Sequence, residues 1–108
     1  MTIQFNTDKN INGNEEFIAP YQAQIKDEFS RYSDLITRIE VHLSDQDGNK
    51  NGLNAMHCTI EARLEGYQPI AVSNQSDTLD QAVSGATDKL AASLDTIIGK
   101  LSNHQAQQ

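Results

Sequence analysis

The stretch of residues 76–101, SDTLDQAVSGATDKLAASLDTIIGKL, decides how this chain folds. Its apolar residues recur every three or four positions, which predicts one apolar stripe along a helix of about seven turns. The residues of this stripe are Leu79, Val83, Ala86, Leu90, Leu94, Ile97 and Leu101. Asp77 is the expected N-cap of the helix, with Ser76 as the alternative. The opposite face is small and polar with few positive charges, so the helix is expected to dock through its apolar stripe.

A strand and a second amphipathic helix precede this stretch. Ile3 and Phe5 alternate with polar residues, which predicts an N-terminal strand. Between about residues 14 and 33, apolar side chains again recur at three- and four-residue spacing, which predicts the first helix. These side chains are Ile18, Tyr21, Ile25, Phe29 and Tyr32. Pro20 removes a hydrogen bond when it lies beyond the first turn, so the helix is expected to start near Ala19 or to bend there.

Three further strands fill the middle of the chain. Residues 38–44 and 56–64 alternate between apolar and polar side chains, and residues 69–74 form a shorter strand of the same kind. The connection between the first two of these strands is rich in Asp, Asn and Gly, which predicts an antiparallel hairpin. Pairing Leu43 with Met56 would make His42 and His57 cross-strand neighbours on the exposed face of the sheet.

The order of elements is therefore β, α, β, β, β, α. The apolar face of a single sheet is buried best when both helices cover it. We expect an α+β fold of the type βαβββα, with two helices packed on one face of a four-stranded sheet. The length of 108 residues fits one domain over residues 1–104, followed by a disordered tail over residues 105–108.

Charge and cysteine content restrict the class of protein. Eight Lys and Arg against fifteen Asp and Glu give a net charge of -7. Since Lys and Arg supply most of the affinity for phosphate backbones, the overall charge argues against a nucleic acid partner, but local basic patches occur on acidic proteins. A lone cysteine, Cys58, cannot form an internal disulfide, and no apolar run is long enough for a signal peptide or a membrane span. We therefore expect a cytoplasmic protein with no membrane partner.

The loop before the third strand resembles the start of a calcium-binding loop. Its side chains match the EF-hand pattern at the early positions Asp47, Asn49, Asn51 and Gly52. The twelfth position is Cys58 instead of a bidentate Glu, and strands flank the loop where helices are required. An ordinary flexible hairpin loop is therefore the favoured interpretation.

His42 and His57 provide fewer ligands than a zinc site needs, and the nearby Glu40 joins them only in one assumed register. We therefore expect no metal site, although a metal or small-ligand module at this pair is an open alternative. Cys58 faces the core side of its strand, where it is expected to act as a small hydrophobe. The sequence also contains no nucleophile elbow and no Gly-rich phosphate loop. The chain is accordingly not expected to be an enzyme or to need a cofactor.

The motifs in this order resemble the ribosome hibernation-promoting factor family, also called the sigma-54 modulation or ribosome-associated inhibitor family. Four runs carry the resemblance: IQFNT at 3–7, FSRYSDLI at 29–36, RIEVHLS at 38–44 and DTLDQAVSGATDKLAASL at 77–94. The last run has the acidic start, the small apolar spacing and the Asp-Lys-Leu sequence typical of the family's final helix. The resemblance extends over nearly the whole chain.

This resemblance implies a layout similar to a double-stranded RNA-binding domain and a function without catalysis. Family members bind the small ribosomal subunit, either as the free 30S particle or within the 70S ribosome, near the decoding region of 16S rRNA. They inhibit translation under stress or slow growth. The positions that match basic family positions, or that border the same helices, are Lys26, Arg31, Lys89 and Lys100. These four residues are the candidate rRNA-binding residues, because Lys and Arg make most contacts to RNA phosphates.

Three positions depart from the family pattern. Ala92, Thr96 and Ile98 stand where hibernation factors commonly carry Arg or Lys. Each missing phosphate contact is expected to weaken RNA binding and its dependence on salt. The alternative hypothesis is therefore a diverged acidic member that binds a protein partner, for example a basic one, instead of rRNA. Either function is compatible with a monomer or a weak dimer.

Overall fold

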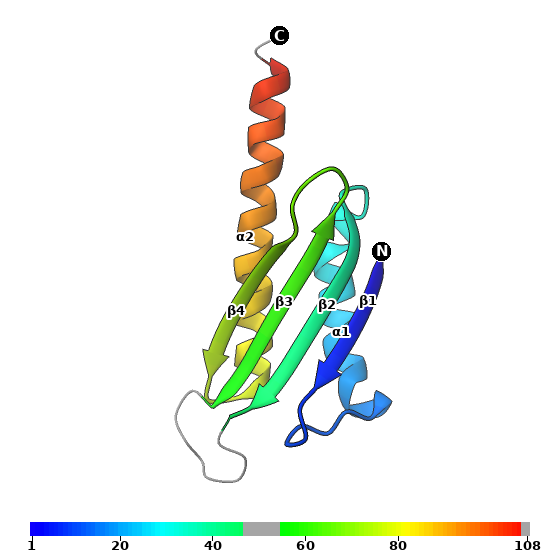
Figure 1. Ribbon diagram of the computed structural model, residues 1–108, viewed down its shortest axis with the longest axis vertical. Coiled ribbons are helices and arrows are strands. Elements are labelled where there is room, and N and C mark those ends of the chain that lie inside the picture. The colour runs from blue at the N-terminus through cyan, green and yellow to red at the C-terminus, as the bar shows by residue number, and fades with distance from the viewer. Residues whose placement is uncertain (47–54, 107–108) are drawn as a thin grey trace.

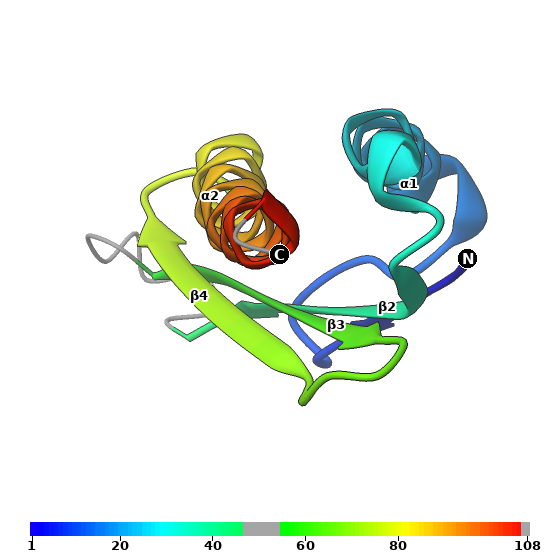
Figure 2. The same cartoon turned by 90° about the horizontal axis from the view of Figure 1, so that it is seen from above.

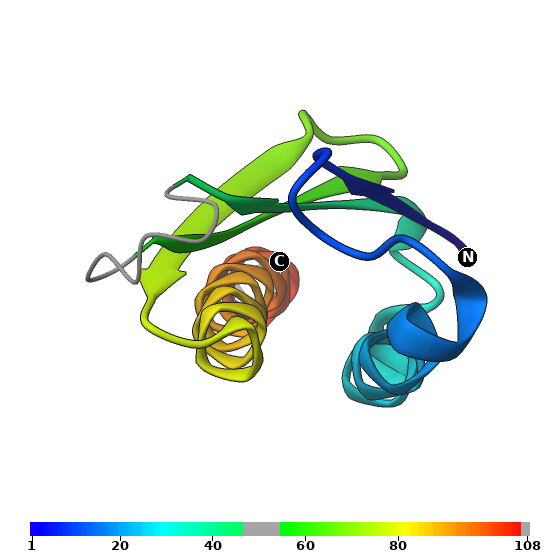
Figure 3. The same cartoon turned by 90° about the horizontal axis from the view of Figure 1, so that it is seen from below.

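The computed structural model describes residues 1–46 and 55–106 and confirms the predicted βαβββα fold (Figure 1). In chain order the elements are β1 (Thr2–Thr7), α1 (Glu15–Phe29), the 3-10 helix η1 (Ser30–Tyr32), β2 (Ile36–Asp45), β3 (Met56–Leu64), β4 (Ile70–Ser76) and α2 (Leu79–Ala106). The strands form one sheet in the order β1-β2-β3-β4, with β1 parallel to β2 and the other neighbours antiparallel. Both helices cover the same face of this sheet, and the other face is open (Figures 2 and 3).

The core lies between the sheet and the helix layer. The largest fully buried side chains are Phe29, Ile25, Ile36, Ile39, Leu43, Ile60, Leu90, Leu94, Val41, Val83 and Cys58. Full burial of a large aliphatic or aromatic side chain contributes roughly 1.5–3 kcal/mol each. The predicted stripe of α2 is buried from Leu79 to Leu94, and Ile97 packs against the core. The side chain of Leu101 lies outside the described part of the structure.

The first helix starts where the sequence indicates and then continues through its proline. Asn14 caps α1, because its side-chain oxygen accepts a hydrogen bond of 2.9 Å from the N–H of Phe17. Pro20 lies inside the helix and has no N–H to donate to the carbonyl of Glu16. The alternative start near Ala19 is therefore wrong. Burial of the apolar face of α1 against the sheet offsets the missing hydrogen bond.

The long helix begins and ends later than predicted. Thr78 caps α2, because its Oγ1 accepts a hydrogen bond of 3.1 Å from the N–H of Gln81. The two predicted caps lie before this position because β4 extends to Ser76. At the other end, α2 continues to Ala106 instead of ending at residue 101, and Figure 1 shows it projecting beyond the sheet. Residues 107 and 108 of the predicted tail lie outside the described residues.

The predicted register between β2 and β3 is wrong by two residues. Leu43 pairs with Cys58, and it is Asp45 that pairs with Met56. A shift of two residues keeps every side chain on its own face, so the apolar pattern alone cannot exclude it. As a result, the two histidines are diagonal neighbours: His42 lies opposite Thr59, and His57 lies opposite Ser44.

Candidate functional site

Two tyrosine–aspartate hydrogen bonds join the first helical segment to α2. The hydroxyl of Tyr21 in α1 donates to Asp80, and the hydroxyl of Tyr32 in η1 donates to Asp95, both at 2.6 Å. Burial, followed by the hydrogen bond to the neighbouring carboxylate, raises the pKa of each tyrosine to about 12. Both hydroxyls are therefore protonated donors at neutral pH. They hold the two helices together at two points along the groove between them.

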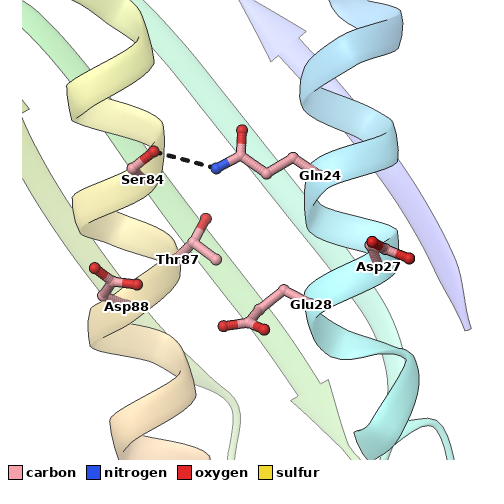
Figure 4. Close-up of a pocket in the computed structure, with 6 residues that line it drawn as sticks. All are labelled: Gln24, Asp27, Glu28, Ser84, Thr87 and Asp88. Atoms are coloured by element: carbon pink, nitrogen blue, oxygen red, sulfur yellow. Dashed lines mark hydrogen bonds between the residues drawn. The ribbon is translucent and has the colours of Figure 1, made fainter.

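A hollow of about 310 Å³ lies in this groove between the two tyrosine contacts. Figure 4 shows the side chains that line it. Across it, Nε2 of Gln24 donates to Oγ of Ser84 at 3.2 Å. Asp27 and Glu28 line it from α1, and Asp88 lines it from α2. None of its described lining residues is a Lys or Arg. Three carboxylates in one hollow make the local potential negative, which repels phosphate.

Two of the four candidate rRNA-binding residues have their positions fixed by specific contacts. The guanidinium carbon of Arg31 lies 4.6 Å from the ring centroid of Tyr32, a cation–π geometry. Nζ of Lys89 donates to the backbone carbonyl of Ser73 at 2.7 Å. Since Ser73 belongs to β4, Lys89 lies on the side of α2 that faces away from α1. The structure therefore does not bring Arg31 and Lys89 together.

The other two candidates lie elsewhere on the helix layer, and both are exposed. Lys26 is four residues after Gln22 on α1, on the flank opposite to the residues that contact α2. Lys100 lies near the projecting end of α2. The four cations surround the helix layer, and the acidic hollow occupies its centre. Sequence reasoning missed the hollow because its carboxylates come from two helices whose facing sides are set only by packing.

The three positions at which the resemblance implies basic residues all face solvent. Ala92, Thr96 and Ile98 are exposed on α2, with 37% of the surface of Ile98 accessible. Oγ1 of Thr96 donates to the carbonyl of Ala92 at 3.0 Å, a bond within the helix itself. Long basic side chains fit at these positions without disturbing the core.

The histidines on the open face of the sheet and the buried thiol are the remaining candidate reactive groups. Among the described residues, no group of three or more His, Cys, Asp or Glu side chains could hold a metal ion. Burial raises the pKa of the Cys58 thiol to about 12, so the nucleophilic thiolate is scarce at neutral pH. The early positions of the calcium-loop pattern, residues 47–52, lie outside the described residues. Over 1–46 and 55–106, no helix is long and apolar enough to cross a membrane.

Comparisons with solved structures show the same fold. The chain is similar to the N-terminal domain of Thermus thermophilus Protein Y, with a TM-score of 0.66 and 20% identity over 89% of this chain and 94% of that one. It is also similar to a ribosomal subunit interface protein from Coxiella burnetii, with a TM-score of 0.67 and 16% identity over 92% of this chain and 99% of that one. At these identities the likeness establishes the fold alone, and no curated protein matches the sequence. The family model described as Sigma 54 modulation protein / S30EA ribosomal protein matches residues 6–102, and the chain therefore belongs to that family.

Proposed function

We propose that this protein is a cytoplasmic ribosome-associated factor that binds the small ribosomal subunit and inhibits translation under stress or slow growth. The observation that supports this most directly is the family match, which spans residues 6–102. The family consists of non-catalytic ribosome-binding factors. Such a factor acts by occupying a site on the ribosome. Its action therefore depends on a shape that fits this site and on affinity for the ribosome, and it needs no reactive group.

The expected affinity depends on few phosphate contacts. Three of the candidate residues are exposed on the helix layer: Lys26, Arg31 and Lys100. The ammonium group of Lys89 must give up its hydrogen bond to the carbonyl of Ser73 before it can bind a phosphate. Each phosphate contact to RNA contributes roughly 0.7–0.9 to the slope of log affinity against log salt. Four contacts therefore give a slope of roughly -3, and raising the salt fourfold weakens binding by about 60-fold.

Co-sedimentation with purified 30S and 70S particles over a salt series tests the proposal. The protein should sediment with the particles at low salt and dissociate with the slope given above. Arg31→Gln should flatten the slope by about one unit. Arg63→Gln is the matched control, because Arg63 lies on the open sheet face, 3.4 Å from Glu61, and it should leave binding unchanged. Absence of any association at low salt would contradict the proposal.

The acidic hollow supports a second candidate function, the binding of a basic protein partner at the groove between the helices. Glu28 and Asp88 lie on opposite sides of this groove, where they can face a basic surface. A pull-down from nuclease-treated lysate distinguishes the two functions. A partner retained after RNA removal, and lost on combining Glu28→Gln with Asp88→Asn, supports this candidate. Loss of every partner with the RNA contradicts it.

A further inference from the structure

The outer edge of β1 is open for pairing with another strand. The N–H of Asp8 donates to the carbonyl of Leu43 in β2 at 3.1 Å. Because successive backbone groups of a strand point to alternate edges, the N–H and C=O groups of Ile3, Phe5 and Thr7 point away from β2. Within residues 1–46 and 55–106, the hydrogen bonds of β1 backbone groups all go to β2. A row of backbone donors and acceptors is therefore exposed along this edge.

The opposite edge of the sheet is protected, and β1 is not. At β4, the ammonium group of Lys89 bonds to the carbonyl of Ser73, and a lysine at a strand edge opposes the pairing of further strands. β1 reads TIQFNT and contains no charged residue and no proline. Edge strands without such protection are surfaces on which extended peptides add.

A hollow of about 520 Å³ lies beside this open edge, between β1 and α1. Phe5 and Thr7 line it from β1, and Ile18, Ala19 and Gln22 line it from α1. Ala19 and Gln22 lie on the flank of α1 opposite to the flank that bonds α2, so the hollow opens on the outer side of β1. Ile18 is buried and Phe5 is half-buried, which gives the hollow an apolar floor. Its volume is sufficient for a large side chain.

We propose that an extended segment of a partner protein adds to the outer edge of β1 and inserts a large apolar side chain into this hollow. Side chains of neighbouring strands project to the same face, so alternate side chains of the added segment point toward Phe5 and Ile18. Glu15 also lines the hollow, and Glu16 follows it in the first turn of α1. These charges complement a Lys or Arg that lies two residues from the inserted side chain, on the same face of the added segment. The site is separate from the groove between the two helices, since the two hollows share no lining residue.

An extended segment fits this edge with less crowding than a second copy of the chain. Figures 2 and 3 show α1 lying over the β1 end of the sheet. A two-fold pair of β1 strands would place the second α1 on the same side of the joined sheet, next to the first. Packed helices need about 8–10 Å between their axes, whereas neighbouring strands lie about 4.8 Å apart, so two α1 helices would crowd this edge. A segment that brings only a strand adds no second helix, and it is therefore the occupant that this edge favours.

Titration of the isotope-labelled full chain with a capped heptapeptide tests this inference by NMR. The peptide has leucine at its centre, lysine two residues to either side of the leucine, and threonine at the remaining positions. We expect amide shifts confined to β1 and to the first half of α1, with slowed exchange of the outward amides of Ile3, Phe5 and Thr7. A peptide in which serine replaces the leucine is the control for non-specific charge attraction. Equal binding of this control, or shifts centred on the groove between the helices, would overturn the proposal.

Two exposed alanines of α1 make a matched pair of variants. Ala19→Lys places a charged side chain in the hollow, whereas Ala23→Lys adds the same charge at a position that does not line it. Lysine is a good helix former, so both variants should fold, which a far-UV circular dichroism spectrum can verify. Ala19→Lys should weaken peptide binding at least tenfold, and Ala23→Lys by less than twofold. Equal effects of the two variants, or no binding of the peptide to the unmodified protein, would also overturn the proposal.

Discussion

Gly85 of α2 lies so close to β4 that Gly85→Ala should destabilise the protein, although this change stabilises most helices. A Cβ atom at Gly85 would lie 2.0 Å from Nδ2 of Asn74 and 2.5 Å from its Cγ, which is far inside contact distance. Nδ2 of Asn74 also donates to the carbonyls of Gln81 and Ala82, at 3.2 and 3.4 Å. The methyl group would therefore displace the whole amide and remove both of its hydrogen bonds to α2.

The expected change in the free energy of unfolding is the sum of one stabilising and two destabilising contributions. Alanine is favoured over glycine in a helix interior by about 0.8–1.0 kcal/mol. The displaced side chain of Asn74 must leave its preferred rotamer, which costs about 0.5–1.5 kcal/mol. Losing the bonds of Asn74 costs about 1 kcal/mol, since both are long and the side chain can regain water. The free energy of unfolding should therefore fall by roughly 0.5–1.7 kcal/mol.

Gly99 in the same helix provides the matched control. No atom lies within 4 Å of a Cβ added at Gly99, so Gly99→Ala should raise the free energy of unfolding by up to about 1 kcal/mol. Urea unfolding followed by circular dichroism measures both changes on one scale. In an Asn74→Ala background the obstructing amide is gone, and Gly85→Ala should then become stabilising. A neutral or stabilising effect of Gly85→Ala in the unmodified protein, or an undiminished cost in the Asn74→Ala background, would refute this reasoning.

Three other outcomes are expected. Adding Arg at positions 92 and 96 and Lys at 98 should tighten sedimentation with 30S particles and steepen the salt slope by up to about three units, and an unchanged slope would argue against rRNA contact through this face. Because the pKa of Tyr32 is raised to about 12, its contribution to stability is complete below pH 10 and is lost as pH rises through 12. Urea unfolding between pH 8 and 11 should therefore show a smaller fall in stability for Tyr32→Phe than for the unmodified protein. Thr78→Ala should cost about 1 kcal/mol because it removes the N-cap of α2, which thermal unfolding can measure.

The order and type of the elements follow from periodicity. Alternation over residues 56–64 gives β3 with its correct bounds, because one face of the strand contacts the core and the other is more accessible. The three- and four-residue spacing likewise gives the buried faces of both helices. The register of β2 on β3 does not follow, since a two-residue shift leaves both faces unchanged. The N-cap of α2 was assigned too early because only pairing with β3 shows that β4 continues to Ser76.

The candidate site was predictable only in part. The sequence alone determined the fold class and the overall negative charge, because these depend on composition and on spacing within one element. Only the tertiary structure decided that acids from two helices share one hollow and that Lys89 bonds to β4. It also decided that β1 has an open edge beside a hollow. These features arise where side chains distant in sequence meet, and the distances between them are set by how the helices pack on the sheet.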